Sequence, residues 1–353
     1  MQTDAAIPFG RRTVGPGKPP LVIAELSGNH NQSLDRALAI VDAAAAAGAH
    51  AVKLQTYTAD IMTLDVREPG FLIEDRASLW YGRSLYDLYR EAHTPWEWHD
   101  ALFARARELG MECLSTPFDA SAIAFLERYD PPAYKIASFE LTDLELISAA
   151  AATGRPLILS TGMASLEEIA EAVHAARSSG AGRLILLKCT STYPASPANS
   201  NLATIPDLRQ RFDALAGISD HTPGIGVAVA AVALGAVLIE KHFTLRRADG
   251  GIDSAFSLEP AELRALVQES ERAWLGVGSV RYGALKDEEA SVQFRRSLYV
   301  VRDMRAGETY TRENVRAIRP GYGLTPKHYR EVLGRRAAAD TRKGTPLTWN
   351  LIE

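Results

Sequence analysis

The sequence predicts an α/β barrel of the (β/α)8, or TIM-barrel, class, followed by a small C-terminal domain. Between about Leu21 and Leu275, short apolar runs alternate with amphipathic stretches, a pattern typical of repeated strand–helix units. Eight predicted strands in about 255 residues fit such a barrel in number and length. An open, doubly wound sheet is the alternative, but it would not explain why polar residues follow almost every predicted strand. A barrel gathers these strand ends at the face where active sites lie.

The predicted strands are short and rich in aliphatic residues. They are Leu21–Glu25, Ala51–Gln55, Glu112–Ser115, Ala133–Ile136, Leu157–Ser160, Leu184–Lys188, Leu215–Ile218 and Val237–Glu240. Several of the helices predicted between them carry capping signals, such as Ser165 three residues before Glu168 and Gly48 at a C-terminal end. The predicted helices are Leu34–Ala47, Trp96–Leu109, Ser121–Arg128, Leu144–Ala152, Leu166–Ser178, Gly226–Gly235 and Glu262–Leu275.

Two parts of the chain depart from this alternation. The segment from about 59 to 94 is too long for an ordinary loop between strand and helix and is rich in aromatic residues, so we expect a lid or an interface there. Further on, the pattern breaks at Gly276-Val277-Gly278 and at a charged stretch from Lys286 to Glu289. We therefore expect a barrel domain over residues 1–280, a linker over 281–290 and a small domain with little core of its own over 291–353.

The composition excludes several functional classes. The net charge is −4 over 353 residues, so no overall positive field would recruit nucleic acid or an anionic membrane, and neither is an expected partner. No apolar run has the length of a transmembrane helix. Cys113 and Cys189 lie far apart in apolar runs, which favours two core residues of a reduced chain over a disulfide. We expect a soluble, cytoplasmic protein that meets anionic ligands with locally placed Lys and Arg.

Two histidines follow the last two predicted strands. His221 comes after Leu215–Ile218, and His242 comes after Val237–Glu240. A single histidine is more often a hydrogen-bonded core residue than a metal ligand. Two imidazoles at neighbouring strand ends, however, converge on one face of a barrel and can hold a divalent metal. The pair therefore predicts a metal-assisted enzyme.

Lysines, hydroxyls and one carboxylate follow the other predicted strands. Lys53 and Gln55 share one strand and face the same way because strand side chains alternate. Together with Lys135 and the hydroxyls near other strand ends, they suit a dianionic phosphate. Glu25 beside a metal suggests acid–base chemistry on a polarised carbonyl. Each residue alone has a structural interpretation, and Lys241 in particular is explained equally well as a salt-bridged side chain.

Seven motifs at these strand ends resemble the sialic acid synthase family, whose members condense phosphoenolpyruvate with an N-acylated sugar. The matching stretches are AELSGNH (24–30), KLQT (53–56), STPF (115–118), YKIAS (134–138), STGM (160–163), SDHT (219–222) and EKHF (240–243). They run through the whole predicted barrel. The C-terminal segment resembles the antifreeze-like (SAF) domain of the family.

Five stretches resemble the pseudaminate-forming subgroup of that family. They are AELSGNH (24–30), KLQTYT (53–58), the YELY-like Tyr86-Asp87-Leu88-Tyr89, YKIASFE (134–140) and LKCTSTYP (187–194). Phe139, Lys188 and Ser191 stand where typical N-acetylneuraminate synthases have glycine, histidine and asparagine. The resemblance thus implies a metal-dependent condensation of phosphoenolpyruvate with 2,4-diacetamido-2,4,6-trideoxy-L-altrose. An N-acetylneuraminate or legionaminate synthase is the alternative within the family.

The resemblance also implies roles for individual residues. His221 and His242 would ligate a divalent ion, manganese or magnesium, and Glu25 would act as acid or base. Gln55, Tyr193 and Asp253 would contact the sugar or metal-bound water. Arg319 would enter the site of the partner subunit in a domain-swapped homodimer. The residues expected around phosphoenolpyruvate are Lys53, Thr116, Lys135, Ser138, Ser160, Ser191 and Ser219.

Two readings from other classes remain. A Schiff-base aldolase would use Lys188 or Lys135 as nucleophile, but it leaves the histidine pair unexplained. A non-enzymatic ice- or carbohydrate-binding module would place the function in the C-terminal domain. Residues 291–353 lack the regular repeats that a flat ice-binding surface requires, so the enzyme is favoured.

Overall fold

The computed structural model describes residues 5–353, which form two compact units. The first unit ends at Gly278, and the second spans Ser279–Glu353. The boundary between the units therefore lies just before the predicted linker. No helix in the described part of the chain is both long and apolar enough to cross a lipid bilayer.

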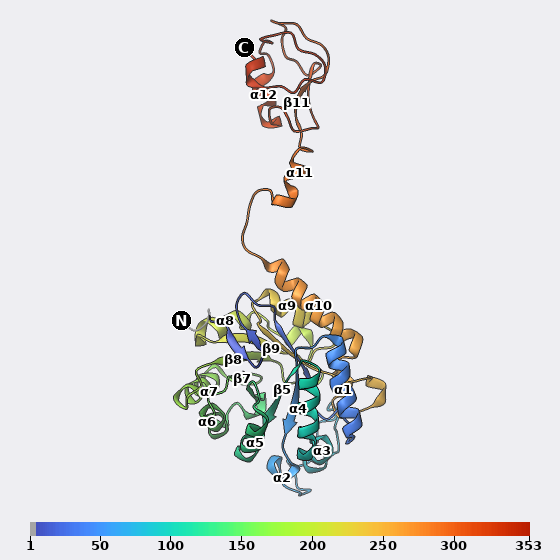
Figure 1. Ribbon diagram of the computed structural model, residues 1–353, viewed down its shortest axis with the longest axis vertical. Coiled ribbons are helices and arrows are strands. Elements are labelled where there is room, and N and C mark those ends of the chain that lie inside the picture. The colour runs from blue at the N-terminus through green and yellow to red at the C-terminus, as the bar shows by residue number, and fades with distance from the viewer. Residues whose placement is uncertain (1–4) are drawn as a thin grey trace. The chain divides into compact units, whose positions relative to one another are not determined.

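The first unit is a closed barrel of eight parallel strands surrounded by helices, which confirms the predicted fold class (Figure 1). The strands follow one another around the barrel in chain order, and β10 closes it by pairing with β3. The barrel strands are β3 (Leu21–Glu25), β4 (Ala51–Thr56), β5 (Glu112–Pro117), β6 (Tyr134–Ile136), β7 (Leu157–Ser160), β8 (Leu184–Cys189), β9 (Leu215–Ser219) and β10 (Leu238–His242).

Amphipathic helices cover the outside of the barrel. They are α1 (Leu34–Ala47), α4 (His99–Glu108), α5 (Ala120–Leu126), α6 (Leu144–Ala152), α7 (Leu166–Ser178), α8 (Thr204–Phe212), α9 (Gly226–Ala233) and α10 (Pro260–Val277). Helix α7 begins with the predicted capping box of Ser165 and Glu168, and Gly48 ends α1 with a positive φ of 91°. Helix α8 was missing from the sequence-based assignment.

The strands have two apolar faces, and this arrangement positions the site. Outward side chains such as Val52 and Leu54 pack against the helices in one cluster, whereas inward side chains such as Ile23 and Leu187 form a second cluster inside the barrel. Along each strand the inward positions change from apolar to polar toward the C-terminal end. The barrel therefore has an apolar base and a polar mouth.

An N-terminal hairpin closes the base of the barrel. Strands β1 (Ile7–Phe9) and β2 (Arg12–Val14) pair antiparallel, and Phe9 and Val14 are fully buried in the inner apolar cluster. The sequence did not predict this hairpin, because three-residue strands carry too little periodicity to be recognised. With the base closed, access to the interior is left to the C-terminal mouth.

The insertion after β4 is folded rather than a loose loop. It contains α2 (Ala59–Met62), an antiparallel bridge between Leu72 and Ser84, and α3 (Leu85–Ala92).

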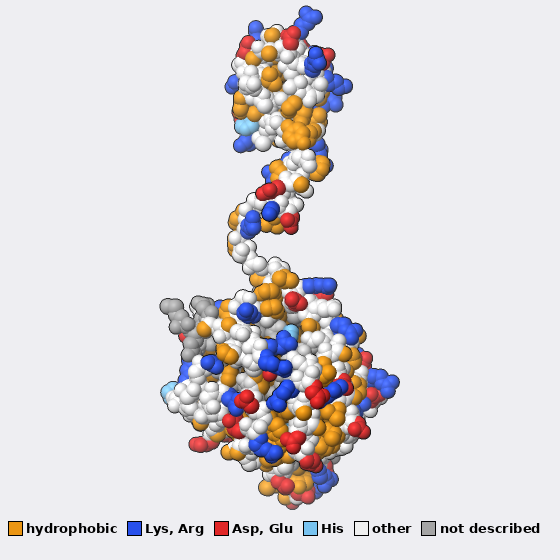
Figure 2. Space-filling view, in the orientation of Figure 1, with side chains coloured by type: hydrophobic (Ala, Val, Ile, Leu, Met, Phe, Trp, Pro, Cys, Tyr) orange, Lys and Arg blue, Asp and Glu red, His pale blue; other side chains and the backbone are white. Residues whose placement is uncertain are grey.

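On the visible face of the molecule in Figure 2, basic and acidic side chains are intermixed. Ion pairs between neighbouring helices, such as Arg105 Nε with Asp42 Oδ1 at 2.6 Å, contribute to this pattern.

The second unit has a core of its own, contrary to the expectation from sequence. Strands β11 (Ser297–Val300) and β12 (Val315–Ile318) pair antiparallel, and the short helices α11 (Glu289–Val292) and α12 (Tyr329–Val332) lie before and after them in the chain. Leu298, Val300, Val315 and Leu347 are fully buried in a single cluster. Because these apolar residues come from separate short segments, no local periodicity revealed them.

Candidate active site

A cavity of about 390 Å³ lies at the C-terminal mouth of the barrel. It collects twelve of the predicted site residues, one or two from each contributing strand or loop, as the alternation of inward side chains requires. Those lining residues are Glu25, Lys53, Gln55, Thr116, Lys135, Ser138, Ser160, Tyr193, Ser219, His221, His242 and Asp253. Lys53 and Gln55 both face the cavity, as predicted.

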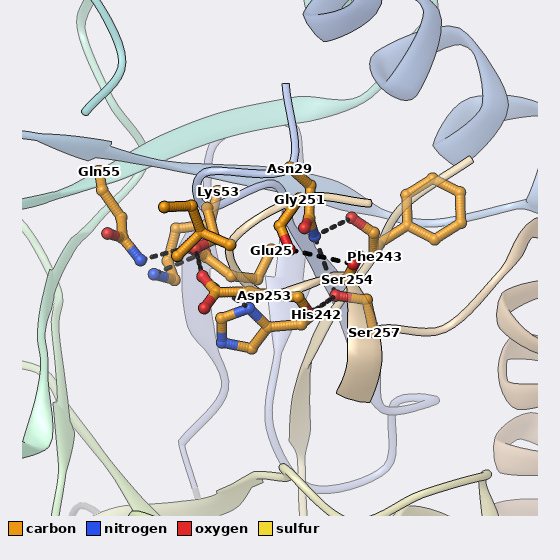
Figure 3. A network of polar contacts seen from close by, with 12 residues as sticks. Glu25, Asn29, Lys53, Gln55, His242, Phe243, Gly251, Asp253, Ser254 and Ser257 are labelled. Carbon is orange, nitrogen blue, oxygen red and sulfur yellow. Dashed lines mark hydrogen bonds and ion pairs between the residues drawn. The ribbon is translucent and has the colours of Figure 1, made fainter. Parts of the chain in front are cut away.

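Two carboxylates and two lysines alternate on the floor of this cavity. Lys53 Nζ lies 2.6 Å from Glu25 Oε2 and 4.0 Å from Glu240 Oε1, and Lys135 Nζ lies 3.9 Å from Glu240 Oε2. All four residues are buried. Gln55 Nε2 also donates to Glu25 Oε1 at 2.9 Å (Figure 3). The floor therefore holds both signs of charge at short range in a medium that screens them little.

Burial and neighbouring charge shift the pKa values of this cluster in opposite directions. Burial raises the pKa of Glu25 to about 7, although Lys53 opposes the shift. Burial also favours the neutral form of Glu240, but Lys135 and Lys53 outweigh it and hold the pKa of Glu240 below its ordinary value. Burial lowers the pKa of Lys135. Glu25 is thus the carboxyl group in the cluster that exchanges a proton most readily near neutral pH.

The two imidazoles lie side by side, with ring centroids 5.3 Å apart. His221 Nδ1 lies 3.0 Å from the Thr190 carbonyl oxygen, so this nitrogen is the donor and Nε2 keeps its lone pair in the neutral ring. His242 Nδ1 is buried without a hydrogen-bond partner, and the Asp253 carboxylate lies 3.8 Å from it (Figure 3). Burial holds the pKa of His242 well below its ordinary value, so this ring is neutral. An unpartnered, neutral imidazole nitrogen beside a second imidazole fits a divalent cation.

The loop after β10 is fastened to the loop after β3. Asn29 Nδ2 donates to the Phe243 carbonyl and to Ser257 Oγ, both at 2.9 Å, and Ser257 Oγ donates to the Asp253 carbonyl at 2.6 Å. The Ser27 hydroxyl contacts the Asp253 carboxylate directly. Figure 3 shows Asp253 held beside His242 by this network.

In residues 5–353, no group of three or more His, Cys, Asp and Glu side chains is arranged to hold a metal ion.

Comparison with known proteins places these features in a family. Residues 40–282 match the NeuB family, and residues 295–353 match the SAF domain. The chain belongs to the NeuB family.

This NeuB family member is similar to several named synthases. It is 42% identical to a pseudaminic acid synthase of Campylobacter jejuni over 333 residues, 94% of this chain and 96% of the relative. It is 41% identical to the pseudaminic acid synthase of Helicobacter pylori over 95% of this chain and 98% of the relative. It is 36% identical to an N,N'-diacetyllegionaminic acid synthase of Legionella pneumophila over 94% of both chains.

Solved structures agree with this assignment. The spore coat polysaccharide biosynthesis protein SpsE of Bacillus subtilis has a TM-score of 0.68 and 33% identity, with 99% of both chains covered. The N-acetylneuraminic acid synthetase of Leptospira borgpetersenii, in complex with citrate, has a TM-score of 0.72 and 32% identity, with 83% of this chain and 96% of that chain covered.

Two predicted site residues of this NeuB family chain do not line the cavity. Ser191 lies just beyond it, where its hydroxyl and that of Ser138 both approach Gly162 so closely that a Cβ there would collide with them. The Gly162 N–H donates to Ser138 Oγ at 3.1 Å. Arg319 belongs to the second unit.

Two lysines at strand ends point away from the cavity. Lys188 occupies an outward position on β8, and its Nζ donates to the Cys189 carbonyl at 2.6 Å. The Lys188 version of the aldolase alternative therefore has no support in this geometry. Lys241 is buried on the outer face of the barrel wall, and its Nζ lies 2.7 Å from Asp220 Oδ2. The geometry therefore supports the interpretation of Lys241 as a salt-bridged side chain.

Sequence reasoning missed three chemically active side chains of the cavity: Glu240, Glu140 and Cys189. Glu240 is two positions before His242 on β10, so alternation alone would have found it. Cys189 is buried, as predicted, but as the last inward residue of β8 it also lines the cavity, with its Sγ 3.8 Å from His221 Nδ1. Burial favours the thiol, but contact with His221 outweighs it and lowers the pKa of Cys189 to about 7.

Proposed function

We propose that this NeuB family member is a pseudaminic acid synthase. It would condense phosphoenolpyruvate with 2,4-diacetamido-2,4,6-trideoxy-L-altrose and water to give pseudaminic acid and phosphate. The observation that carries the proposal is the 41–43% identity to three pseudaminic acid synthases along at least 94% of the chain. Relatives that make N,N'-diacetyllegionaminic acid are 34–36% identical. We expect the enzyme to work in the cytoplasm.

His221 and His242 would hold a divalent ion, Mn²⁺ or Mg²⁺. Such an ion supplies Lewis acidity, which polarises the aldehyde oxygen of the open-chain sugar. The donor set supports this role, since the buried Nδ1 of His242 has no hydrogen-bond partner among the described residues. Gln55, Tyr193 and Asp253 line the same cavity and are potential contacts for the sugar or for metal-bound water.

Phosphoenolpyruvate would lie against Lys53 and Lys135. Hydroxyl groups around the rim would donate to its carboxylate and phosphate, and Gly162 lets two of them approach a single anion. The carboxylates of Glu25 and Glu240 already balance the two lysines, so a bound trianion would favour the protonated form of Glu25. The hydroxyl-bearing residues proposed for this role are Thr116, Ser138, Ser160, Ser191 and Ser219.

The reaction needs one proton at the sugar and one water at phosphoenolpyruvate. The methylene carbon of phosphoenolpyruvate forms a bond to the aldehyde carbon, and the aldehyde oxygen takes a proton from Glu25. Water adds to the resulting cationic C2 centre and loses one proton to the Glu25 carboxylate, which restores the acid. The bond between C2 and the bridging oxygen then breaks, the C2 hydroxyl passes its proton to the departing phosphate, and a ketone is left at C2. Lysines near the phosphate stabilise the negative charge of the departing group without a covalent bond.

Phosphate release with each candidate sugar tests the proposal. Release with the altrose derivative should exceed release with N-acetylmannosamine and with the diacetamido precursor of legionaminic acid. Release with N-acetylmannosamine but none with the altrose derivative would refute the assignment. Trapping of a sugar or pyruvate adduct on Lys135 by borohydride would instead support the aldolase.

We further propose a domain-swapped homodimer in which Arg319 completes the partner's site. Mixing two inactive variants, Glu25→Gln and Arg319→Ala, tests this idea. In a swapped heterodimer, one site combines an intact Glu25 with an intact Arg319, so activity should return after subunit exchange. If Arg319 acts within its own chain, each site keeps one defect and the mixture stays inactive.

A further inference from the structure

The catalytic cavity has two unlike sides. The floor carries charged and hydroxyl groups from the strand ends, whereas one wall is built by the insertion after β4 and is mostly apolar. We call Met62, Ile73, Trp80, Leu85 and Leu88 the apolar wall. None of the motifs that indicate phosphoenolpyruvate or metal binding lies in this segment. The wall is therefore left without a role in the chemistry described above.

The wall is held in place by the backbone of the insertion. The Ile73 N–H donates to the Arg83 carbonyl at 2.9 Å, which fixes Ile73 in a hairpin. Leu85 begins α3, whose N-terminus is capped by a Ser84 hydroxyl that accepts from the Asp87 N–H. These bonds fix the backbone that carries Ile73 and Leu85 at the cavity, so their apolar surface there is a built feature.

Aromatic contacts connect the wall to the histidine pair. The Tyr193 ring centroid lies 4.5 Å from that of His221. The Trp80 ring centroid in turn lies 5.8 Å from that of Tyr193. Trp80 Nε1 also donates to the Ile252 carbonyl at 3.0 Å, next to Asp253. The wall and the histidine pair therefore line one cavity and are connected through Tyr193 and Trp80.

We propose that the apolar wall binds the terminal methyl group of a 6-deoxy sugar and selects against a terminal hydroxymethyl group. This inference rests on the proposed function, because it takes the reacting aldehyde to lie at the histidines. The side chains of Ile73 and Leu85 offer a hydroxyl no donor or acceptor in place of its water partner, whereas a methyl group loses nothing on contact with them. Apolar pockets discriminate against an added hydroxyl by roughly 100-fold.

The test compares kcat/KM for pairs of sugars that differ only at C6. One pair is 2,4-diacetamido-2,4,6-trideoxy-L-altrose and its 6-hydroxy counterpart, and the other is the corresponding pair of manno configuration. The wild-type protein should prefer the 6-deoxy member by about 10- to 100-fold. Ile73→Thr and Leu85→Asn should each lower that preference about 10-fold. Because the readout is a ratio within one preparation, it does not depend on how much of a variant is folded.

Leu64→Asn is the matched control. Leu64 lies in the same insertion, is 63% exposed and does not line the cavity, so the ratio should stay at the wild-type value. Equal use of both members of a pair by the wild type would overturn the proposal, as would wall variants that leave the preference unchanged. Turnover of the manno pair alone would refute the altrose assignment, but the same C6 ratio within that pair would still decide the role of the wall.

Discussion

Replacing Glu25 with glutamine tests the acid–base assignment most directly. The amide has almost the same shape as the carboxylate and can still accept from Gln55 Nε2, which lies 2.9 Å from Glu25 Oε1. Lys53 keeps its hydrogen bond to Thr116 Oγ1 at 3.1 Å and its proximity to Glu240 at 4.0 Å. The substitution also removes the charge that faces Lys53 Nζ at 2.6 Å, but Lys53 retains these two polar neighbours, so we expect a folded protein that has lost a proton donor and one half of an ion pair.

The size of the effect follows from the proposed role. A positioned general acid contributes roughly 100- to 10,000-fold to the rate, so Glu25→Gln should lower kcat by about that factor. This corresponds to about 3–5 kcal/mol of activation free energy. The KM for phosphoenolpyruvate should change much less, since the lysines that neutralise it remain.

The pH dependence of kcat shows whether Glu25 acts as an acid or as a base. Burial raises the pKa of Glu25 to about 7, so the carboxyl group is protonated below that pH and ionised above it. A proton donor with this pKa makes kcat of the wild type fall as the pH rises through about 7, and the glutamine variant should lack this limb. The same pKa shift gives folding stability that is present at acidic pH and is lost as the pH rises through about 7.

The assay is continuous phosphate release between pH 5.5 and 9, with manganese binding measured separately by calorimetry. Glu127→Gln is the matched control, because Glu127 bonds Arg155 and Tyr134 and does not line the cavity. A Glu25→Gln variant with full activity would remove Glu25 from the mechanism. A wild-type limb that rises through pH 7 would make Glu25 a base instead of an acid.

Three further predictions concern the anion site, the buried ion pair and the metal. Gly162→Ala places a methyl group against the Ser191 hydroxyl and should raise the KM for phosphoenolpyruvate at least 10-fold. Gly182→Ala is the control, because Gly182 has open space around it and its replacement should leave KM unchanged. Equal KM values for the two variants would argue against an anion site at Gly162. Lys241→Met leaves the Asp220 carboxylate buried without its ion-pair partner. Urea denaturation should therefore show a free energy of unfolding lower by about 3–5 kcal/mol, with kcat per folded molecule retained. A decrease under about 1 kcal/mol would mean that the ion pair contributes little to stability. Treatment with EDTA should abolish phosphate release, and added Mn²⁺ should restore it; activity that survives EDTA would contradict the metal assignment.

Much of the catalytic mouth was predictable because a barrel translates sequence position into spatial position. Each strand ends at the same face, so Glu25, Lys53 and His242 could be expected to meet before any distance was known. The same rule would have found Glu240, whose inward direction follows from that of His242. Its mid-strand position hid it, because attention to strand ends favours the residues that follow a strand, and the inward side of Cys189 likewise shows only once the direction of β8 is known.

The sequence by itself determined the fold class, the family motifs and the residues that crowd the mouth, because all of these depend on local periodicity and on strand ends. Only the tertiary structure decided what those residues do to one another. The raised pKa of Glu25 depends on its burial and on the Glu240 carboxylate, which comes from the last strand of the barrel, whereas Lys53 opposes the shift. The apolar wall likewise depends on how the insertion folds back over the cavity. Such long-range contacts leave no periodic signal in the sequence, so the histidine pair was predictable and the electrostatic balance around it was not.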